Sequence, residues 1–248
     1  MPKEKHHEFP IPDWIQSYVE RNIGKPPLWQ FPPIPEMETG IEFRTLNFHN
    51  QKHFLELFKK DEDPWVEKRF KNAKSVYEYV CMSRIIMPYS FKRGGQDWLV
   101  YQKEKCIGIL HAFNFSKESG EFTQRRCSIG YAFGQSVRGS GIPQKVVQHL
   151  QHYLFTKWNM LYLTASVKRK NIRSIRFLKG LGYIERPLEK DEQTNEEGAV
   201  SDTIHLDLFR SKRTQNKIQA YWEESTESYL AWKVTWVKQP DGSYKIPR

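Results

Sequence analysis

The sequence has little cysteine and no long apolar run. Its three cysteines, Cys81, Cys106 and Cys127, are odd in number and form no CxxC pair. This argues against a disulfide framework and against a cysteine-based zinc site. No apolar stretch approaches the roughly 18 residues of a membrane span, and no apolar segment typical of a secretory signal follows the charged residues 1–9. We therefore expect a soluble, cytoplasmic protein that binds no membrane.

Residues that could bind a metal ion are also rarely placed at a suitable spacing in the sequence. His149 and His152 lie three residues apart in a predicted helix, a spacing that can hold a metal ion. A metal site needs further ligands, and the sequence places none beside these two. We therefore expect no metal.

Acidic residues are too few to balance the basic ones. The 248 residues include 39 Lys and Arg against 29 Asp and Glu, a formal net charge of +10. With 38% hydrophobic and 14% aromatic residues, the chain is too rich in large apolar groups for pervasive disorder. The excess of positive charge indicates an anionic ligand or partner.

Proline and aromatic residues mark off both ends of the chain. Prolines recur between Pro10 and Pro35, which predicts that residues 1–40 form an arm with only a short helix at 13–22. The aromatic residues of this arm, such as Trp14, favour packing on the body of the protein. Residues 211–248 form a second extension, in which we expect a helix near 217–222 and a small hairpin around residues 239–242.

Between these extensions, strand-like and helix-like segments alternate. Strands are predicted at 41–46, 98–102, 106–114, 126–133, 161–167, 183–185 and 203–209, and helices at 50–59, 75–87, 143–158 and 171–181. This order is typical of a mixed α/β domain with one parallel connection in its middle.

A glycine-containing segment between a predicted strand and a predicted helix is the sharpest local motif. It runs from Gln135 to Pro143 and contains Arg138-Gly139-Ser140-Gly141. Glycines let backbone N–H groups turn toward one point, and a helix start adds its positive dipole end, so the segment fits a phosphate or pyrophosphate. The Arg138 side chain would add to that field. A tight turn with basic surface residues explains the same pattern equally well. The segment is neither a P-loop nor a dinucleotide GxGxxG.

A second segment, Asn171–Tyr183 (NIRSIRFLKGLGY), begins about 30 residues after Ile129–Gly141 (IGYAFGQSVRGSG), with a predicted helix and strand between them. In this order, the chain resembles the GNAT superfamily of acyl-CoA-dependent N-acyltransferases. It is most similar to the RimJ/RimL-like branch, which acetylates ribosomal-protein N-termini. The resemblance covers roughly residues 41–210.

The resemblance implies an α/β GNAT fold. Its sheet would be mixed and mostly antiparallel, with flanking helices and with the strands at 128–133 and 161–167 splayed apart. It also implies a GNAT domain at 41–210, between the N-terminal arm (1–40) and the C-terminal extension (211–248).

The same resemblance implies acetyl-CoA as cosubstrate. Pantetheine would enter the gap between the splayed strands and pair with backbone groups, and a backbone N–H near Ala132 or Phe133 would stabilise the thioester oxygen. The residues expected to bind the cosubstrate are Tyr131, Ala132, Phe133, Arg138, Gly139, Ser140, Gly141, Ile142, Asn171 and Ser174.

Two positions depart from the family pattern. Pro143 removes one backbone donor from the loop that would bind the phosphates, although proline suits the first turn of a helix. Ser128 stands where much of this branch has a glutamate that acts as general base. Glu121 and His111, on neighbouring predicted strands, are the alternative bases, although an ordinary structural role is the more common one for each. Ser174 matches the position of the acid that protonates the leaving thiolate.

The expected function is transfer of an acetyl group from acetyl-CoA to a primary amine, by direct attack in a ternary complex. The acceptor would be a peptide N-terminus, a polyamine or a small amine. The charge of +10, Ser128 and Pro143 leave an alternative open. On that alternative the chain is an RNA- or ribosome-associated binding protein on a GNAT scaffold, with weak or no catalysis.

Overall fold

The computed structural model describes residues 10, 12–22, 31–87, 94–115, 125–186 and 202–220, together with the backbone of 237–238 and 244–245. The strands are β1 (Ile41–Thr45), β2 (Gly95–Gln102), β3 (Lys105–Phe113), β4 (Arg126–Phe133), β5 (Tyr162–Lys168), β6 (Ile184–Glu185), β7 (Thr203–Phe209), β8 (Val237–Lys238) and β9 (Tyr244–Lys245). The α-helices are α1 (Asp13–Asn22), α2 (Gln51–Phe58), α3 (Ala73–Cys81), α4 (Ile142–Thr156) and α5 (Ile172–Gly180). Short helical turns occur at η1 (Lys68–Lys71), η2 (Met82–Ile86) and η4 (Gln135–Val137).

One seven-stranded sheet organises the body, in the order β1-β2-β3-β4-β5-β7-β6. Its pairs are antiparallel except for β4 and β5, which run parallel. This confirms the mixed α/β sheet with one parallel connection in its middle.

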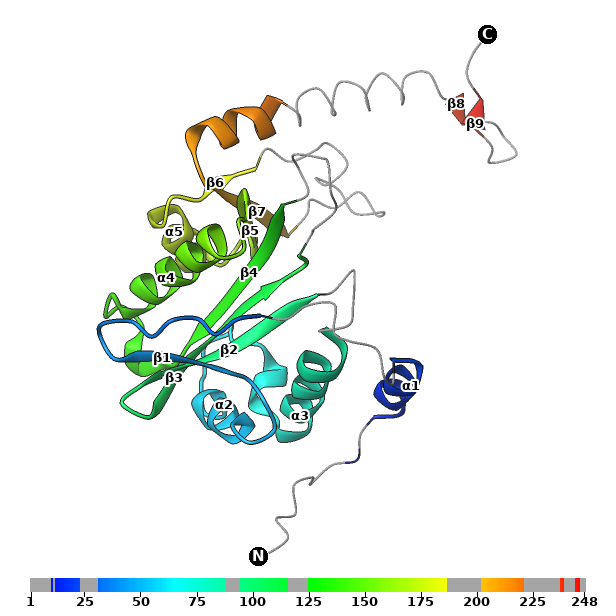
Figure 1. The fold of residues 1–248 in the computed structure, drawn as a ribbon, viewed down its shortest axis with the longest axis vertical. Coiled ribbons are helices and arrows are strands. Elements are labelled where there is room, and N and C mark those ends of the chain that lie inside the picture. Colours follow the sequence, from blue (N-terminus) through cyan, green and yellow to red (C-terminus); the bar gives the residue numbers. More distant parts are fainter. Residues whose placement is uncertain are drawn as a thin grey trace, which may run out of the picture.

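The helices cover both faces of this sheet, with α2 and α3 on one side and α4 and α5 on the other (Figure 1). Alternation along β2 explains how both faces are filled, because successive side chains of a strand point in opposite directions. Trp98 and Val100 join the core beneath α4, whereas Leu99 and Tyr101 join the core beneath α2 and α3. The sheet is therefore buried on both faces.

The helix predicted at 75–87 is divided in the structure. Asn72 caps α3, because its side-chain oxygen accepts a hydrogen bond from the backbone N–H of Ser75 at 3.0 Å. The α-helix ends at Cys81 and continues as the π-helical turn η2. Such a turn widens the helix locally and is frequent at functional sites.

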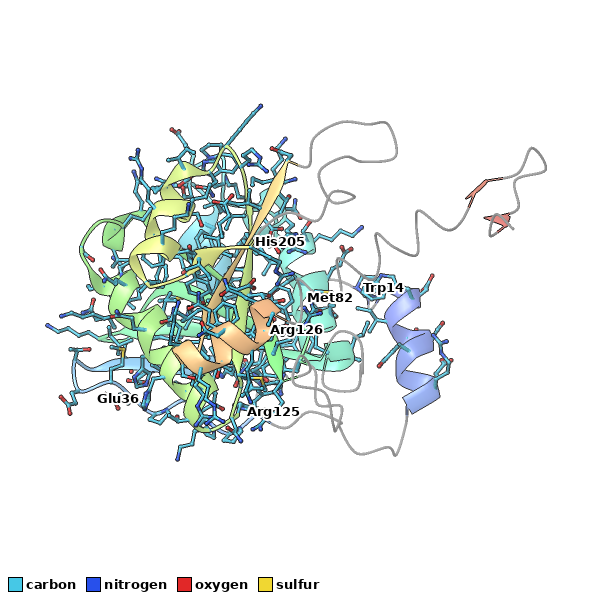
Figure 2. All side chains as sticks on the ribbon, turned by 90° about the horizontal axis from the view of Figure 1, so that it is seen from above. Trp14, Glu36, Met82, Arg125, Arg126 and His205 are labelled. Atoms are coloured by element: carbon cyan, nitrogen blue, oxygen red, sulfur yellow. The ribbon has the colours of Figure 1, made fainter. Side chains whose placement is uncertain are left out.

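The N-terminal arm is helical where predicted. Ile15 of α1 is fully buried against Tyr77 and Cys81. The packing expected of Trp14 is wrong, because this side chain is 54% exposed (Figure 2). Further along, Phe31 packs against three aromatic rings of the body, those of Trp98, Phe115 and Trp158.

The C-terminal extension begins with a helix at 212–220, so the start expected at residue 217 is wrong. The antiparallel pair β8–β9 confirms the predicted hairpin, although residues 239–243 of its turn lie outside the described residues. No helix among the described residues is both long and apolar enough to cross a membrane.

Gly108 offers a test of this packing. A Cβ at this position would lie 2.5 Å from Cδ1 of Phe133 and 2.9 Å from the carbonyl oxygen of Ala132, so the backbone of β4 would have to move. We expect Gly108→Ala to lower the free energy of unfolding by about 1–3 kcal/mol, measured by urea denaturation. Gly180→Ala is the matched control, because a Cβ there has nothing within 4 Å and should cost no stability. Equal stability of the two variants would contradict the prediction.

Candidate functional site

Strands β4 and β5 separate after a short paired stretch. Their pairing covers only Arg126–Tyr162, Cys127–Leu163 and Ser128–Thr164, after which the strands diverge. On its other edge, β4 stays paired with β3 as far as Phe133. The divergence therefore frees one edge of residues 129–133. This confirms the predicted splay.

The direction of the freed backbone groups follows from strand alternation. The N–H of Gly134 donates to the carbonyl of Ile107 at 2.9 Å, and Ile107 directly precedes Gly108, the first residue of β3 that pairs with β4. Since N–H groups alternate between the two edges of a strand, those of Phe133 and Tyr131 point toward the gap. The N–H of Ala132 points toward β3. Of the two amides predicted as oxyanion donors, only that of Phe133 thus faces the gap.

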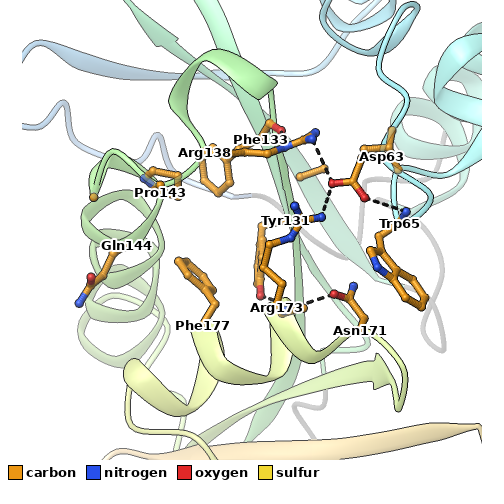
Figure 3. Close-up of a pocket in the computed structure, with 15 residues that line it drawn as sticks. Asp63, Trp65, Tyr131, Phe133, Arg138, Pro143, Gln144, Asn171, Arg173 and Phe177 are labelled. Atoms are coloured by element: carbon orange, nitrogen blue, oxygen red, sulfur yellow. Dashed lines mark hydrogen bonds and ion pairs between the residues drawn. The ribbon is translucent and has the colours of Figure 1, made fainter.

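A cavity of about 380 Å³ lies along the end of β4, beside the first turns of α4 and α5 (Figure 3). The predicted cosubstrate-binding residues on its wall are Tyr131, Ala132, Phe133, Arg138, Gly139, Gly141, Asn171 and Ser174. Ser140 and Ile142 lie within the same loop but are not part of the wall. Residues from β4, the following loop and α5 thus converge on one slot.

The loop after β4 turns through two glycines in the left-handed region. Gly139 and Gly141 have φ angles of +78° and +80°, where a residue with a side chain is strained. Ser140 fastens the turn, since its hydroxyl donates to the carbonyl of Val137 at 2.7 Å. Within the described part of the chain, the amides of Gly139 and Gly141 have no backbone acceptor. Both remain available to a ligand at the start of α4, where the helix dipole is positive.

Pro143 stands in the first turn of α4 and lines the same cavity. Its ring is buried and packs against the protein interior, although proline has no backbone N–H to offer a ligand. The fold accommodates this departure, as expected of proline at a helix start.

The Arg138 side chain does not supply an unpaired positive charge. Its guanidinium contacts both carboxylate oxygens of Asp61, one of them at 3.2 Å, and lies 3.0 Å from Asp63. Its Nε also donates to the carbonyl of Phe133 at 2.9 Å. Arg173 binds Asp63 as well (Figure 3). Two carboxylates therefore balance these two guanidinium groups in the structure, and the contribution of Arg138 to binding the cosubstrate stays a prediction.

These carboxylates belong to the loop after α2 and are almost completely buried, at 4% and 8% side-chain exposure. For Asp61, burial opposes ionisation, but the hydrogen bond from Arg138 and that from the Asp63 N–H outweigh it. Together they hold the pKa of Asp61 below its ordinary value. Arg138 thus connects the loop that contains Gly139 and Gly141, called the glycine loop below, to the loop that carries Trp65.

Tyr131, Asn171 and Ser174 form a polar group at the mouth of the splay. Asn171 caps α5 by accepting from the N–H of Ser174 at 3.2 Å. The Ser174 hydroxyl lies 2.9 Å from that of Tyr131. Burial raises the pKa of Tyr131 to about 12, so this hydroxyl stays protonated at neutral pH. The two hydroxyls form a short chain that can pass a proton.

A second cavity, of about 450 Å³, lies on the other side of β4. It shares Trp65, Val66, Tyr131 and Ala132 with the first cavity. The two cavities therefore meet at the freed edge of β4.

His111 lines this second cavity at the centre of a three-strand rung. Asp97 of β2, His111 of β3 and Gly130 of β4 stand opposite one another. A Cβ at Gly130 would lie 3.2 Å from the imidazole Cδ2, so this glycine leaves room for the ring. The rung brings His111 to the cavity that Tyr131 and Ala132 also line.

The hydrogen bonds of His111 determine which ring nitrogen carries its proton. An oxygen of Asp97 lies 2.6 Å from Nδ1, and a carboxylate can only accept. The Nδ1 atom must therefore carry the proton, which leaves the lone pair of the neutral ring on Nε2. The Tyr79 hydroxyl lies 2.8 Å from the same Nδ1. Burial, and then the charge of Asp97 and a hydrogen bond to it, raise the pKa of Tyr79 well above its ordinary value, so this hydroxyl stays protonated and donates to Asp97 rather than to Nδ1.

Two other residues singled out in the sequence contribute differently. Ser128 sits on the last paired rung of β4 and β5, where its hydroxyl lies 3.0 Å from that of Thr164. Glu121 lies outside the described residues, so its candidacy as a base stays a prediction. Among the described residues, no group of three or more His, Cys, Asp and Glu side chains could hold a metal ion.

Sequence reasoning missed Asp97, Tyr79, Asp61 and Asp63. Asp97 had a weak signal, because it directly precedes the apolar run at the start of the strand predicted at 98–102; the structure begins β2 at Gly95 and buries Asp97 completely. The loop carboxylates had none. They resemble ordinary polar loop residues until the fold brings Arg138 beside them.

Comparison with protein families gives one match, to the model described as "Acetyltransferase (GNAT) domain", over residues 41–184. No curated protein matches the chain.

Solved structures share the fold at low identity. A RimL ribosomal L7/L12 α-N-protein acetyltransferase in complex with coenzyme A is 14% identical, with a TM-score of 0.56 over 71% of this chain and 97% of that one. The ribosomal-protein-S5-alanine acetyltransferase of Vibrio fischeri is 16% identical, with a TM-score of 0.53 over 74% and 97%. A chimera of the Vibrio cholerae spermidine N-acetyltransferase and hSSAT is 16% identical, with a TM-score of 0.54 over 70% and 97%.

The contact between Arg138 and the two carboxylates predicts a specific loss of stability. Arg138→Gln leaves Asp61 and Asp63 buried without their main counter-charge, which should lower the free energy of unfolding by about 3 kcal/mol at pH 7. Because the folded-state pKa of Asp61 is lowered, the stabilisation is present at neutral pH and is lost as pH falls below about 4. Urea denaturation at several pH values measures both effects.

The double variant Asp61→Asn with Arg138→Gln should recover part of this loss, since one uncompensated charge is removed. Lys145→Gln is the control, because Lys145 is an exposed residue of the same region and its loss should change stability by less than about 0.5 kcal/mol. A wild-type-like Arg138→Gln would show that the contact does not stabilise the fold.

Proposed function

Because the chain belongs to the GNAT acetyltransferase family, we propose that it transfers acetyl from acetyl-CoA to a primary amine by direct attack in a ternary complex. Family membership makes it an acyl-CoA-dependent N-acetyltransferase. One observation carries the proposed mechanism. A slot for the donor and a cavity for the acceptor meet at Tyr131 and Ala132, on the freed edge of β4.

The slot fits the pantetheine arm of the cosubstrate. Amides of Tyr131 and Phe133 point into it, and an extended chain can pair with them as an added strand would. The pyrophosphate would lie against the amides of Gly139 and Gly141, at the start of α4, with Ser140 and Ile142 completing the loop. Asn171 would contact the cosubstrate from the start of α5. In this proposal Arg138 contributes through its backbone and by holding the loop in place.

His111 is the general base of this proposal. The amine arrives largely as an ammonium, which has no lone pair for attack. The Nε2 atom of His111 takes its proton directly or through one water, while Asp97 stabilises the imidazolium that forms. This arrangement supplies the base that Ser128 cannot.

The remaining steps use the freed edge of β4 and the hydroxyl pair. The amine nitrogen attacks the thioester carbon, and the N–H of Phe133 stabilises the oxygen as it gains negative charge. When the carbon–sulfur bond breaks, the Ser174 hydroxyl protonates the thiolate. The Tyr131 hydroxyl, 2.9 Å from that of Ser174, replaces this proton. The attacking nitrogen loses its remaining extra proton as the amide forms, and that proton restores Tyr131 through water. The proton taken earlier by His111 leaves to solvent.

The sheet supports the proposed domain boundaries of 1–40, 41–210 and 211–248. The family match ends at residue 184, but β7 continues the same sheet to Phe209. The transferase domain would therefore extend to about residue 210.

The charge that motivated the RNA- or ribosome-binding alternative is partly neutralised within the fold. Arg138 and Arg173 contact Asp61 and Asp63, and Arg186 pairs with the buried Asp207 at 2.8 Å. These pairs reduce the positive surface available to nucleic acid. The alternative stays a prediction, and the geometry favours the enzyme.

The left-handed backbone at Gly141 predicts that a side chain at this position weakens acetyl-CoA binding. Gly141→Ala places a side chain at φ +80° and should distort the loop, weakening acetyl-CoA binding at least about tenfold in calorimetry. Gly40→Ala is the matched control, because Gly40 has a φ of +70°, with equal space around it, but lies outside the cavity. Unchanged affinity in Gly141→Ala would contradict this placement of the phosphates.

The proposed base predicts a loss of kcat. His111→Gln should lower kcat by about 10²–10⁴-fold while acetyl-CoA affinity stays within about twofold, because only the proton acceptor is removed. Asp97→Asn should also lower kcat, because the imidazole loses the carboxylate that holds the proton of its Nδ1 atom.

Glu121→Gln, assayed in parallel, separates the two bases suggested by the sequence. Near-normal kcat is expected for it. A collapse of kcat in Glu121→Gln with an active His111→Gln would transfer the role to Glu121.

A further inference from the structure

We infer that the acceptor is a small primary amine on an uncharged apolar body, preferably aromatic, and that a second positive charge on it is disfavoured. This inference rests on the proposed function, because it takes the second cavity as the place from which the amine attacks. It depends on three features of that cavity: its walls, its buried charges and the ion pair at its mouth.

The walls of the cavity are mainly apolar and aromatic. Phe70, Tyr79 and Tyr131 provide rings, and the turn η2 adds Met82 and Ile86. The volume of about 450 Å³ suits a small molecule that is largely buried on binding. Burying an aromatic ring in such a space contributes a large share of binding energy, because apolar surface leaves water.

The buried carboxylate of the cavity already has a partner. Asp97 is completely buried, and one of its oxygens receives the proton of His111 at 2.6 Å. Its other oxygen has no hydrogen-bond partner and is itself buried. This carboxylate therefore accepts the Nδ1 proton of the imidazole and fixes the orientation of the ring. Its charge also attracts the one ammonium group that gives its proton to His111.

The charges at the mouth of the cavity are paired with each other. Arg69 Nε lies 2.5 Å from a carboxylate oxygen of Glu67, and both side chains are about half exposed, at 48% and 54%. Arg69 also lies over the rings of Phe70 and Tyr79, 5.3 and 5.1 Å from their centres. Its charge is thus held above the aromatic wall.

A second ammonium on the acceptor would meet this arrangement unfavourably. Among the described residues that line the cavity, the acidic ones are Asp97 and Glu67, and each has a cationic or proton-donating partner. An ammonium at the mouth would meet the pair of Arg69 and Glu67, whose charges already balance each other, and would lose its water of hydration without gaining an unpaired carboxylate. A diamine or polyamine should therefore bind more weakly than a primary amine whose remaining part is apolar and uncharged.

Steady-state kinetics with matched amines tests the inference. The wild-type protein is assayed with saturating acetyl-CoA, following CoA release, with 2-phenylethylamine, spermidine and a peptide bearing a free N-terminus. Heptylamine and 1,7-diaminoheptane form a pair that differs only in the second ammonium. We expect kcat/KM for 2-phenylethylamine to exceed that for spermidine and the peptide at least about tenfold, and heptylamine to exceed the diamine similarly.

Higher kcat/KM for spermidine, the diamine or the peptide overturns the inference and leaves the proposed function intact. Turnover of none of these amines, while calorimetry shows acetyl-CoA binding, overturns the proposed function and the inference with it.

Variants at the mouth of the cavity test the charge argument separately. Arg69→Gln should narrow the preference for heptylamine over 1,7-diaminoheptane at least about threefold, because Glu67 loses its counter-charge and can pair with the second ammonium. Lys68→Gln, on the same turn but outside the cavity wall, removes an equal charge and should leave the ratio unchanged. Met82→Glu adds an unpaired carboxylate to the wall and should shift the ratio toward the diamine. An unchanged ratio in both Arg69→Gln and Met82→Glu overturns the charge argument.

Discussion

The separation of β4 from β5 after Ser128 is the constraint on which the rest of the site depends. A parallel pair that stayed hydrogen-bonded would close the centre of the sheet and leave no path through it. Because pairing stops after three rungs, the amides of Tyr131 and Phe133 have no partner strand. Those amides can bind an extended ligand, and the cavities on both sides of β4 share Tyr131 and Ala132 in their walls.

Buried charge pairs hold this opening in shape. Arg138 joins the glycine loop to Asp61 and Asp63, and the loop that carries these carboxylates also carries Trp65, which lines both cavities. A change at the loop of Gly139 and Gly141 can therefore affect the second cavity through this contact of charged groups. The same pairs mean that a net charge of +10 overstates the positive field at the site.

Much of the fold follows from local patterns that the sequence shows directly. The segment between Ile129 and Gly141 combines an apolar strand, two glycines and a helix start, each recognisable from a few neighbouring residues. Asn171 is likewise a helix cap by its type and position. In contrast, the pairing of Arg138 with Asp61 joins residues 77 positions apart, and the partner of His111 depends on strand register. A shift of one residue would turn Asp97 to the opposite face.

The sequence by itself determined the order of strands and helices, the glycine loop and the residues that mark the family, because these depend on neighbouring residues. Only the tertiary structure decided which charged side chains are paired with opposite charges and which ring nitrogen of His111 has the lone pair. Those properties depend on distances of a few ångströms between strands and loops, and long-range packing sets them. In the structure Arg138 joins its loop to Asp61 and Asp63, and His111 lines the second cavity.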